Sequence, residues 1–189
     1  ALNNADEDTE KDVRERGRLK FSADSVDFFS EDGETGISAS NRIKGVVLHD
    51  ILSRMISADD LETAAGAAME SGEVTAEEHI SIIALLRERI ATAVGRGWFP
   101  ESPAEILNET TLIDTDGEMY RPDRVVICDG RVTVIDYKFG EHYRKYENQL
   151  KRYAGLWNRM GYADVSAYLW YVHTDEVIEV VAKESLFQE

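Results

Sequence analysis

Apolar residues recur every three or four positions in four segments of the chain, and this period predicts four amphipathic helices. Three of them lie in the N-terminal half, each beside residues that cap or end a helix, and the fourth lies after residue 140. The predicted helices cover about 41–57 with Ser40 as N-cap, the stretch from Asp59-Asp60 to Ser71-Gly72, the stretch from the capping-box match Thr75-Ala-Glu-Glu78 to Gly95 or Gly97, and about 143–160.

Between and after these helices, runs rich in β-branched and aromatic residues predict strands. The expected strands cover 104–114, 118–128, 132–140, 165–173 and 176–181. Thr115-Asp-Gly117 predicts a three-residue turn, and Asp129-Gly130 is the signal of a two-residue type I′ hairpin. Helices and strands in this order predict an α/β domain.

The hairpin at Asp129-Gly130 brings two carboxylates together. A two-residue loop fixes the register of its strands, and counting outward from the turn places Asp123 opposite Asp136. Directly opposed residues of an antiparallel pair have Cβ atoms about 4.5–5.5 Å apart, where like charges destabilise the sheet. A divalent cation with oxygen ligands between the two carboxylates would remove this conflict.

Lys138 adds a positive group at the same place, because Asp136 and Lys138 are two positions apart on one strand and leave on the same face. Two alternatives stay open. The pair can be two solvated charges at a strand end, and Pro122 can bend the first strand away before the two carboxylates meet. Glu109 joins the acidic group if the three-residue turn sets the register, whereas a slip of one residue places Thr110 there instead.

Length and composition limit the class of protein. With 189 residues, of which 43% are hydrophobic, the chain is long enough for one domain with a sizeable core. Residues 1–20 are polar and without apolar periodicity, which predicts a disordered or linker segment before a single domain at 21–189. No run of about 18 apolar residues predicts a membrane span. The single cysteine, Cys128, excludes an internal disulfide and a Cys-rich metal site within the chain, so we expect an intracellular, cytoplasmic protein.

The formal net charge of −16, from 37 acidic and 21 basic residues, argues against a protein that wraps nucleic acid on its own. The sign reverses in the helix predicted after residue 140, to which Lys145 and Arg152 belong. This basic helix directly follows the strand with Asp136 and Lys138. Its basic face serves either to contact phosphates or to balance the charge of an acidic protein.

Five motifs follow one another along the chain. They are a helical Gly45-x-x-x-His49-x-x-Leu52, a strand with Glu109, Pro122-Asp123 on the next strand, Ile135-Asp136-Tyr137-Lys138, and Gln149-x-x-x-Tyr153 on the following helix. Together they resemble the nuclease domain of RecB/AddA-type helicase–nucleases, within the PD-(D/E)XK superfamily, over roughly 45–171. The chain has no cysteine cluster, and in this it resembles the AddA-like branch rather than the iron–sulfur members. Arg121-Pro122 departs from the family, which commonly has a glycine before this aspartate.

The resemblance implies a restriction-endonuclease-like core, in which helices flank a mixed central β-sheet and an N-terminal helical part precedes it. It implies that His49, Asp123 and Asp136 bind Mg²⁺ or Mn²⁺, with the main-chain carbonyl of Tyr137 as a further ligand, and that no iron–sulfur cluster is bound. Lys138 would orient and activate the attacking water, which agrees with the physics of metal-assisted phosphodiester hydrolysis.

The resemblance also implies DNA contacts by the helix at 143–160. Gln149 and Tyr153 are four positions apart and share a face, where they would steady the strand or the scissile phosphate. On the residues alone they are equally an amphipathic tyrosine beside a boundary glutamine. Lys145 and Arg152 are expected on the same DNA-binding surface, and Glu109 is a further catalytic candidate.

The implied function is a metal-dependent deoxyribonuclease, an exonuclease or endonuclease that hydrolyses single-stranded DNA during double-strand break repair and recombination. The expected partners are DNA, the helicase domain of the same longer polypeptide and a second helicase–nuclease subunit, and no membrane. A nuclease-like module that only binds DNA or docks a partner is the alternative. The complete set of His49, Asp123, Asp136 and Lys138 argues against it. A small-molecule metallohydrolase is disfavoured by the basic helix.

Overall fold

The computed structural model describes residues 39–101 and 103–180, all of which belong to one compact unit, Ile37–Glu189. The segment predicted to be disordered or a linker, 1–20, lies outside the described residues. Within the described ranges, no helix combines the length and apolar character needed to cross a membrane.

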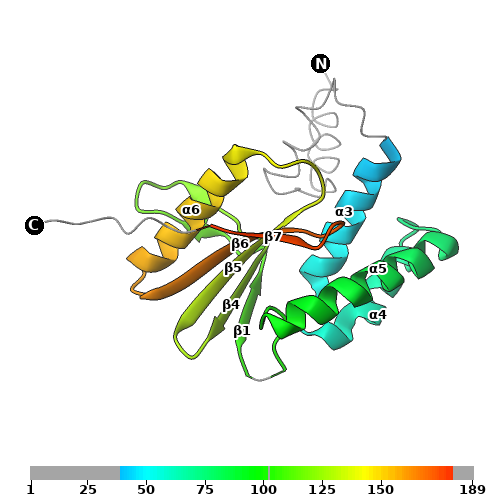
Figure 1. Cartoon of the computed structure of the whole chain (residues 1–189), viewed down its shortest axis with the longest axis horizontal. Helices are drawn as coiled ribbons and strands as arrows, with labels where there is room; N and C mark the ends of the chain where they lie inside the picture. The colour runs from blue at the N-terminus through cyan, green and yellow to red at the C-terminus, as the bar shows by residue number, and fades with distance from the viewer. Residues whose placement is uncertain (1–38, 102, 181–189) are drawn as a thin grey trace, which may run out of the picture. The chain divides into compact units, whose positions relative to one another are not determined.

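Helices form where the apolar period predicts them (Figure 1). They are α3 (Ala39–Arg54), a short 3-10 helix η1 (Ala58–Asp60), α4 (Leu61–Glu70), α5 (Ala76–Gly95) and α6 (Arg144–Arg159). The predicted capping box opens α5, where the Glu78 N–H donates to the Thr75 hydroxyl at 3.2 Å and the Thr75 N–H donates to the Glu78 carboxylate at 3.0 Å.

The first helix differs from its prediction at both ends. Ser40 is not the N-cap, because the helix already includes that residue, and α3 stops at Arg54 rather than near residue 57. The Asp60 carboxylate accepts the backbone N–H groups of Ile56 at 2.8 Å and Ser57 at 2.7 Å. These two donors therefore bond to a side chain instead of continuing the helical ladder.

The central sheet has five strands in the order β1-β4-β5-β6-β7. Their bounds are Glu105–Asn108, Arg124–Cys128, Arg131–Lys138, Asp164–Tyr171 and Glu176–Glu179 in that order. β5 and β6 run parallel, whereas the other neighbouring pairs are antiparallel, so the sheet is mixed. α6 makes the crossover that a parallel pair requires. The predicted α/β class with a mixed sheet is confirmed.

The hairpin between β4 and β5 has the predicted register. Asp129 and Gly130 adopt φ values of 51° and 77°, as a type I′ turn requires, and the ladder runs out to Arg124 opposite Ile135. The structure therefore has the register that places the two carboxylates opposite each other.

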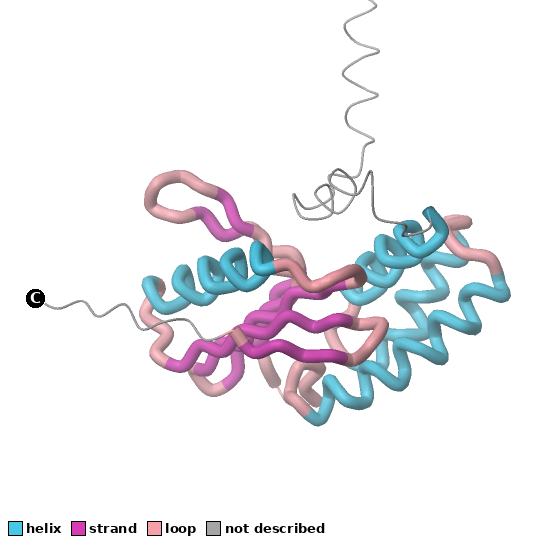
Figure 2. The backbone as a smooth tube through the Cα atoms, turned by 45° about the horizontal axis from the view of Figure 1, so that its top comes forward, coloured by secondary structure: helices cyan, strands magenta, loops and turns pink. Residues whose placement is uncertain are grey.

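The two strands predicted at 104–114 and 118–128 each break in the middle. Their outer parts form a separate two-stranded sheet, β2 (Leu112–Ile113) with β3 (Met119–Tyr120). The predicted three-residue turn joins them, with Gly117 in the left-handed region at φ 87°. This hairpin extends away from the main sheet beside α6 (Figure 2).

The break has a local cause on each strand. Glu109 adopts a left-handed φ of 48°, which no regular strand residue has. Pro122 has no N–H with which to continue the ladder between β4 and β5. The regular ladder is therefore interrupted at Glu109 and Pro122, at the end of the sheet where the candidate site lies.

The sheet is covered on both faces, because successive strand residues point to opposite sides. Ile135 packs in a core with Leu52 and the other buried residues of α3, α4 and α5. Val134 packs in a second core with Leu150 and Trp157 of α6. Figure 1 shows α6 on one side of the sheet and the three-helix layer on the other.

Candidate active site

Asp123 and Asp136 lie where β4 begins and β5 ends, at the position just outside the pair Arg124–Ile135. Asp123 is 4% exposed and Asp136 is 1% exposed, so two carboxylates are buried at neighbouring strand positions. The Asp123 carbonyl accepts the Glu109 N–H of the strand on the far side, at 3.0 Å. The aspartates thus form a non-hydrogen-bonded pair, the type in which side chains approach most closely.

Pro122 faces Tyr137 one position further out, where a regular ladder would place two backbone hydrogen bonds. The Tyr137 N–H donates instead to Oδ2 of Asp123 at 2.7 Å. This bond holds Asp123 against β5, so Pro122 does not carry the aspartate away from the site. The Tyr137 carbonyl lies on the same side of the strand as its N–H, and residue 122 has no N–H to offer it.

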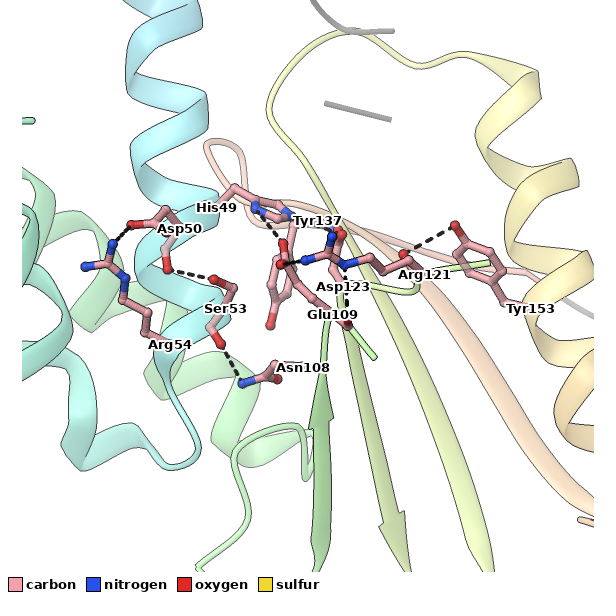
Figure 3. A network of polar contacts seen from close by, with 10 residues as sticks. All are labelled: His49, Asp50, Ser53, Arg54, Asn108, Glu109, Arg121, Asp123, Tyr137 and Tyr153. Atoms are coloured by element: carbon pink, nitrogen blue, oxygen red, sulfur yellow. Dashed lines mark hydrogen bonds and ion pairs between the residues drawn. The ribbon is translucent and has the colours of Figure 1, made fainter. Parts of the chain in front are cut away.

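His49 comes from α3 and reaches the same point from the other layer. Its Nε2 lies 3.0 Å from Oδ1 of Asp123, and its ring meets the Tyr137 ring edge-on at a centroid distance of 6.1 Å. Figure 3 shows the imidazole over the ends of β1 and β4, with Asp123 and Glu109 directed toward it. The helix and the strand pair therefore contribute to one cluster although 74 residues separate His49 from Asp123.

The space beside Gly45, one turn before His49, is filled by protein. A Cβ on Gly45 would lie 3.1 Å from Cβ of Phe139, which directly follows Lys138. The side chain of Phe139 therefore occupies the space beside this glycine. Gly45 thus lets the end of β5 approach α3 closely.

Glu109 lies opposite Asp123, as the three-residue turn predicts, and Thr110 does not take that position. Its carboxylate forms an ion pair with Arg121, whose Nε also donates to the Glu109 carbonyl at 2.9 Å. Oε1 of Glu109 lies 3.6 Å from Nδ1 of His49. Glu109 therefore belongs to the cluster, and Arg121 neutralises part of its charge.

Lys138 is 8% exposed and extends along the same face as Asp136, with Nζ 2.5 Å from Oδ2 of that aspartate. The Nζ also lies 4.3 Å from the centroid of the Tyr146 ring of α6. The buried ammonium thus lies between the Asp136 carboxylate and the Tyr146 ring. Asp136 and Lys138 leave β5 on the same face, as predicted.

The electrostatics of the cluster favour a protonated imidazole. Burial lowers the pKa of His49, but the carboxylate of Asp123, followed by Glu109 and Asp136, raises the His49 pKa to about 9. Burial raises the pKa of Asp123, and the stronger opposing effects of His49, Lys138 and the Tyr137 N–H leave that pKa below its usual range. In the absence of a metal, one positive charge therefore sits on His49 against the acidic group.

The four predicted DNA-contact residues lie on α6 with unequal exposure. Nε2 of Gln149 donates to the Tyr153 hydroxyl at 2.7 Å, and that hydroxyl lies 3.5 Å from the Arg121 carbonyl, next to Pro122. Tyr153 is 3% exposed, whereas Lys145 and Arg152 are exposed. The Gln149–Tyr153 pair thus supports the strand that leads to Asp123, and the two basic residues face solvent.

Arg124 is a residue of the site that sequence reasoning missed. It is 0% exposed, and its guanidinium donates to the carbonyls of Trp98, Met55 and Ile56 at 2.7–2.8 Å. It also lies over the Phe99 ring, with 4.1 Å to the centroid. Arg124 thus fastens the start of β4 to the end of α3. The sequence signal that could have predicted this role is a charged residue at an inward-facing position of an otherwise apolar strand.

The donor set fits a hard divalent cation. Two buried carboxylates, an imidazole and a main-chain carbonyl are groups that Mg²⁺ and Mn²⁺ accept. The residues that would hold the ion are His49, Asp123, Asp136 and Tyr137 through its carbonyl. Across 39–101 and 103–180, no three His, Cys, Asp or Glu side chains already form a ready-made set of metal ligands.

No model of a known protein family matches the chain, and no curated protein matches it in sequence.

Proposed function

We propose that the chain is a metal-dependent deoxyribonuclease domain. The observation that carries the proposal is the burial of Asp123 and Asp136 at adjacent strand ends, with Lys138 bound to one carboxylate and His49 to the other. Burying two like charges costs free energy of folding, and such groups are typical of functional sites. A cation bound there would polarise a phosphoryl oxygen and lower the pKa of a bound water.

The side chains have separate tasks in this proposal. Lys138, held by Asp136 and the Tyr146 ring, directs its ammonium to the attacking water and to the charge that develops on the phosphate. Asp123 is oriented by the Tyr137 N–H, and His49 is oriented by Asp123, so these donors are preorganised by the sheet. Glu109, itself paired with Arg121, lies 3.6 Å from the second nitrogen of the imidazole.

The proposed substrate is single-stranded DNA, and the proposed reaction is phosphodiester hydrolysis during double-strand break repair. The exposed Lys145 and Arg152 of α6 would contact its phosphates, and the Gln149–Tyr153 pair would support the scissile end. An acidic domain needs DNA delivered to it. The attached helicase of a longer polypeptide and a second helicase–nuclease subunit are the proposed partners, in the cytoplasm.

The fold-family assignment is part of the proposal. A mixed five-stranded sheet between helical layers, with the acids at the end of a β-hairpin and the following helix packed behind them, is consistent with a PD-(D/E)XK nuclease of the RecB/AddA type. The single cysteine of the chain supports the AddA-like branch, without an iron–sulfur cluster.

The test compares two variants that lie two positions apart on β5. Lys138→Ala should lose cutting of single-stranded DNA in Mg²⁺ or Mn²⁺ while the metal still raises its melting temperature. Asp136→Asn should lose both cutting and the metal-induced shift. Arg131→Gln, at the far end of the same strand, should behave like wild type. A Lys138→Ala protein that cuts DNA at the wild-type rate would refute the proposal, and DNA binding without any metal-dependent cutting by wild type would favour the non-catalytic module.

A further inference from the structure

The end of the loop after β5 and the first turn of α6 combine aromatic and basic residues in the sequence His142-Tyr-Arg-Lys-Tyr146. His142 and Tyr143 precede the helix, and α6 begins at Arg144. Rings placed between cations are the composition of surfaces that bind single-stranded nucleic acid, because bases stack on the rings while phosphates meet the cations.

The segment borders a cavity of about 410 Å³. Its floor is made by Leu169 and Ile178 of β6 and β7, and its rim by His142, Tyr143 and Arg144. This volume is within the usual range of small-molecule sites, which are mostly apolar with a few polar groups.

A π-stack already lines the cavity. The His142 ring lies parallel to the Tyr171 ring, with centroids 3.9 Å apart and 24° between the planes. Tyr171 is 3% exposed, whereas the His142 side chain is 48% exposed. One face of His142 is therefore covered by Tyr171, and the exposed part of the ring remains accessible to a flat group that would continue the stack.

The cavity adjoins the candidate active site. Tyr171 pairs with Lys138 in the parallel register of β5 and β6. The Tyr143 ring meets the Tyr146 ring edge-on at 5.6 Å, and Tyr146 in turn lies under the Lys138 ammonium at 4.3 Å. A base on His142 would thus belong to a nucleotide close to the phosphate that Lys138 faces.

The charges around the cavity restrict how a strand can lie. Nε2 of His142 pairs with Glu176 at 3.1 Å, and Glu147 is a further carboxylate of the lining. Both repel phosphate. Arg144 and Lys145 are exposed on the α6 side. The phosphates are therefore expected along α6, with the base directed toward the strands.

We propose that His142 and Tyr143, with Arg144 at the rim, form a base-stacking subsite for one nucleotide of single-stranded DNA beside the scissile phosphate. The proposal rests on the proposed nuclease function. In it, the stacking subsite is the feature that selects single-stranded over double-stranded DNA. Bases of a duplex are stacked on each other and cannot enter, whereas an unpaired base can.

The test is binding of a fluorescent oligonucleotide, measured by anisotropy in chelator, where a metal-dependent enzyme does not cut. His142→Ala should weaken binding of single-stranded DNA about tenfold and that of duplex less than about twofold. His142→Phe should bind as wild type, because it keeps the ring and loses only the pairing with Glu176. Arg131→Gln, a matched removal of an exposed cation with 67% side-chain exposure at the other end of β5, should change neither affinity.

An abasic scan adds a measurement that does not depend on a folded alanine variant. One abasic position should cost the wild type about tenfold in affinity, and should cost His142→Ala nothing further. Arg144→Gln should lower the slope of log affinity against log salt by about 0.7.

Equal loss in His142→Ala and His142→Phe, equal loss on duplex, or a flat abasic scan would each overturn the subsite. The proposed nuclease function fails on a different result, namely wild-type protein that does not cut DNA with metal. A protein that cuts single-stranded DNA but shows a flat abasic scan keeps its function and loses the subsite. A protein that shows the abasic effect without cutting keeps the subsite as a binding site.

Discussion

Raising the pH of the metal-free protein should destabilise it through one residue. His49 has a pKa of about 9 in the folded chain against an ordinary 6.5, because Asp123 and its acidic neighbours outweigh the cost of burial. A group with a raised folded pKa adds stability that is complete below pH 6.5 and is lost as the pH rises through about 9. The shift corresponds to about 3 kcal/mol at 1.36 kcal/mol per pKa unit.

Urea denaturation in chelator at several pH values between 6 and 9 measures this loss. His49→Gln removes the titrating group and keeps a side chain that can donate to Asp123, so its free energy of unfolding should stay nearly level where that of wild type falls. Asp123→Asn should flatten the wild-type curve as well, since it removes the charge that holds the imidazolium. Parallel curves for wild type and His49→Gln would refute the assignment of this pH dependence to the cluster.

Three further substitutions test the surroundings of the site. Arg124→Met leaves three buried carbonyls without their donor and should lower the free energy of unfolding in urea by at least about 3 kcal/mol, and Arg124→Lys should not restore it because a lysine lacks the forked donors. Gly45→Ala should reduce the DNA-cutting rate with little change in melting temperature, since its Cβ crowds Phe139 while alanine favours the helix, and Phe139→Leu in that background should recover part of the rate. Pro122→Ala supplies an N–H to the Tyr137 carbonyl and should weaken Mg²⁺ binding severalfold in a thermal-shift titration, without loss of the fold.

The register of the hairpin was predictable because a two-residue turn has one way of pairing its strands. Asp129-Gly130 determined that Asp123 and Asp136 are opposed, and the period of two placed Lys138 beside Asp136. These are local consequences of chain geometry. His49 was different, since no spacing relates a helix residue to a strand 74 positions away, and only the resemblance to a nuclease family suggested it.

The interruption of the outer strands was not predictable from propensity. Residues 104–114 and 118–128 read as two continuous strands, and the register between them does continue across the break. What interrupts the regular ladder is a left-handed Glu109, whose carboxylate and carbonyl both accept from Arg121. Such a conformation depends on a partner twelve residues away, so a local pattern does not contain it. Arg124 escaped prediction for the same reason, because the carbonyls that accept from it lie in two distant segments, at Trp98 and at Met55 and Ile56.

Pro122 does not carry Asp123 away from the site, although its chemistry first suggests that it would. A proline at the start of a central strand ends the ladder, and a strand that bent away there would take Asp123 with it. The N–H of Tyr137 donates to the Asp123 carboxylate, and this bond keeps the carboxylate beside Asp136. Because Pro122 has no N–H, it cannot supply the ladder donor that the Tyr137 carbonyl would otherwise accept. A glycine before the aspartate would donate its own N–H to that oxygen, so in this chain the proline is a positive feature of the candidate metal site.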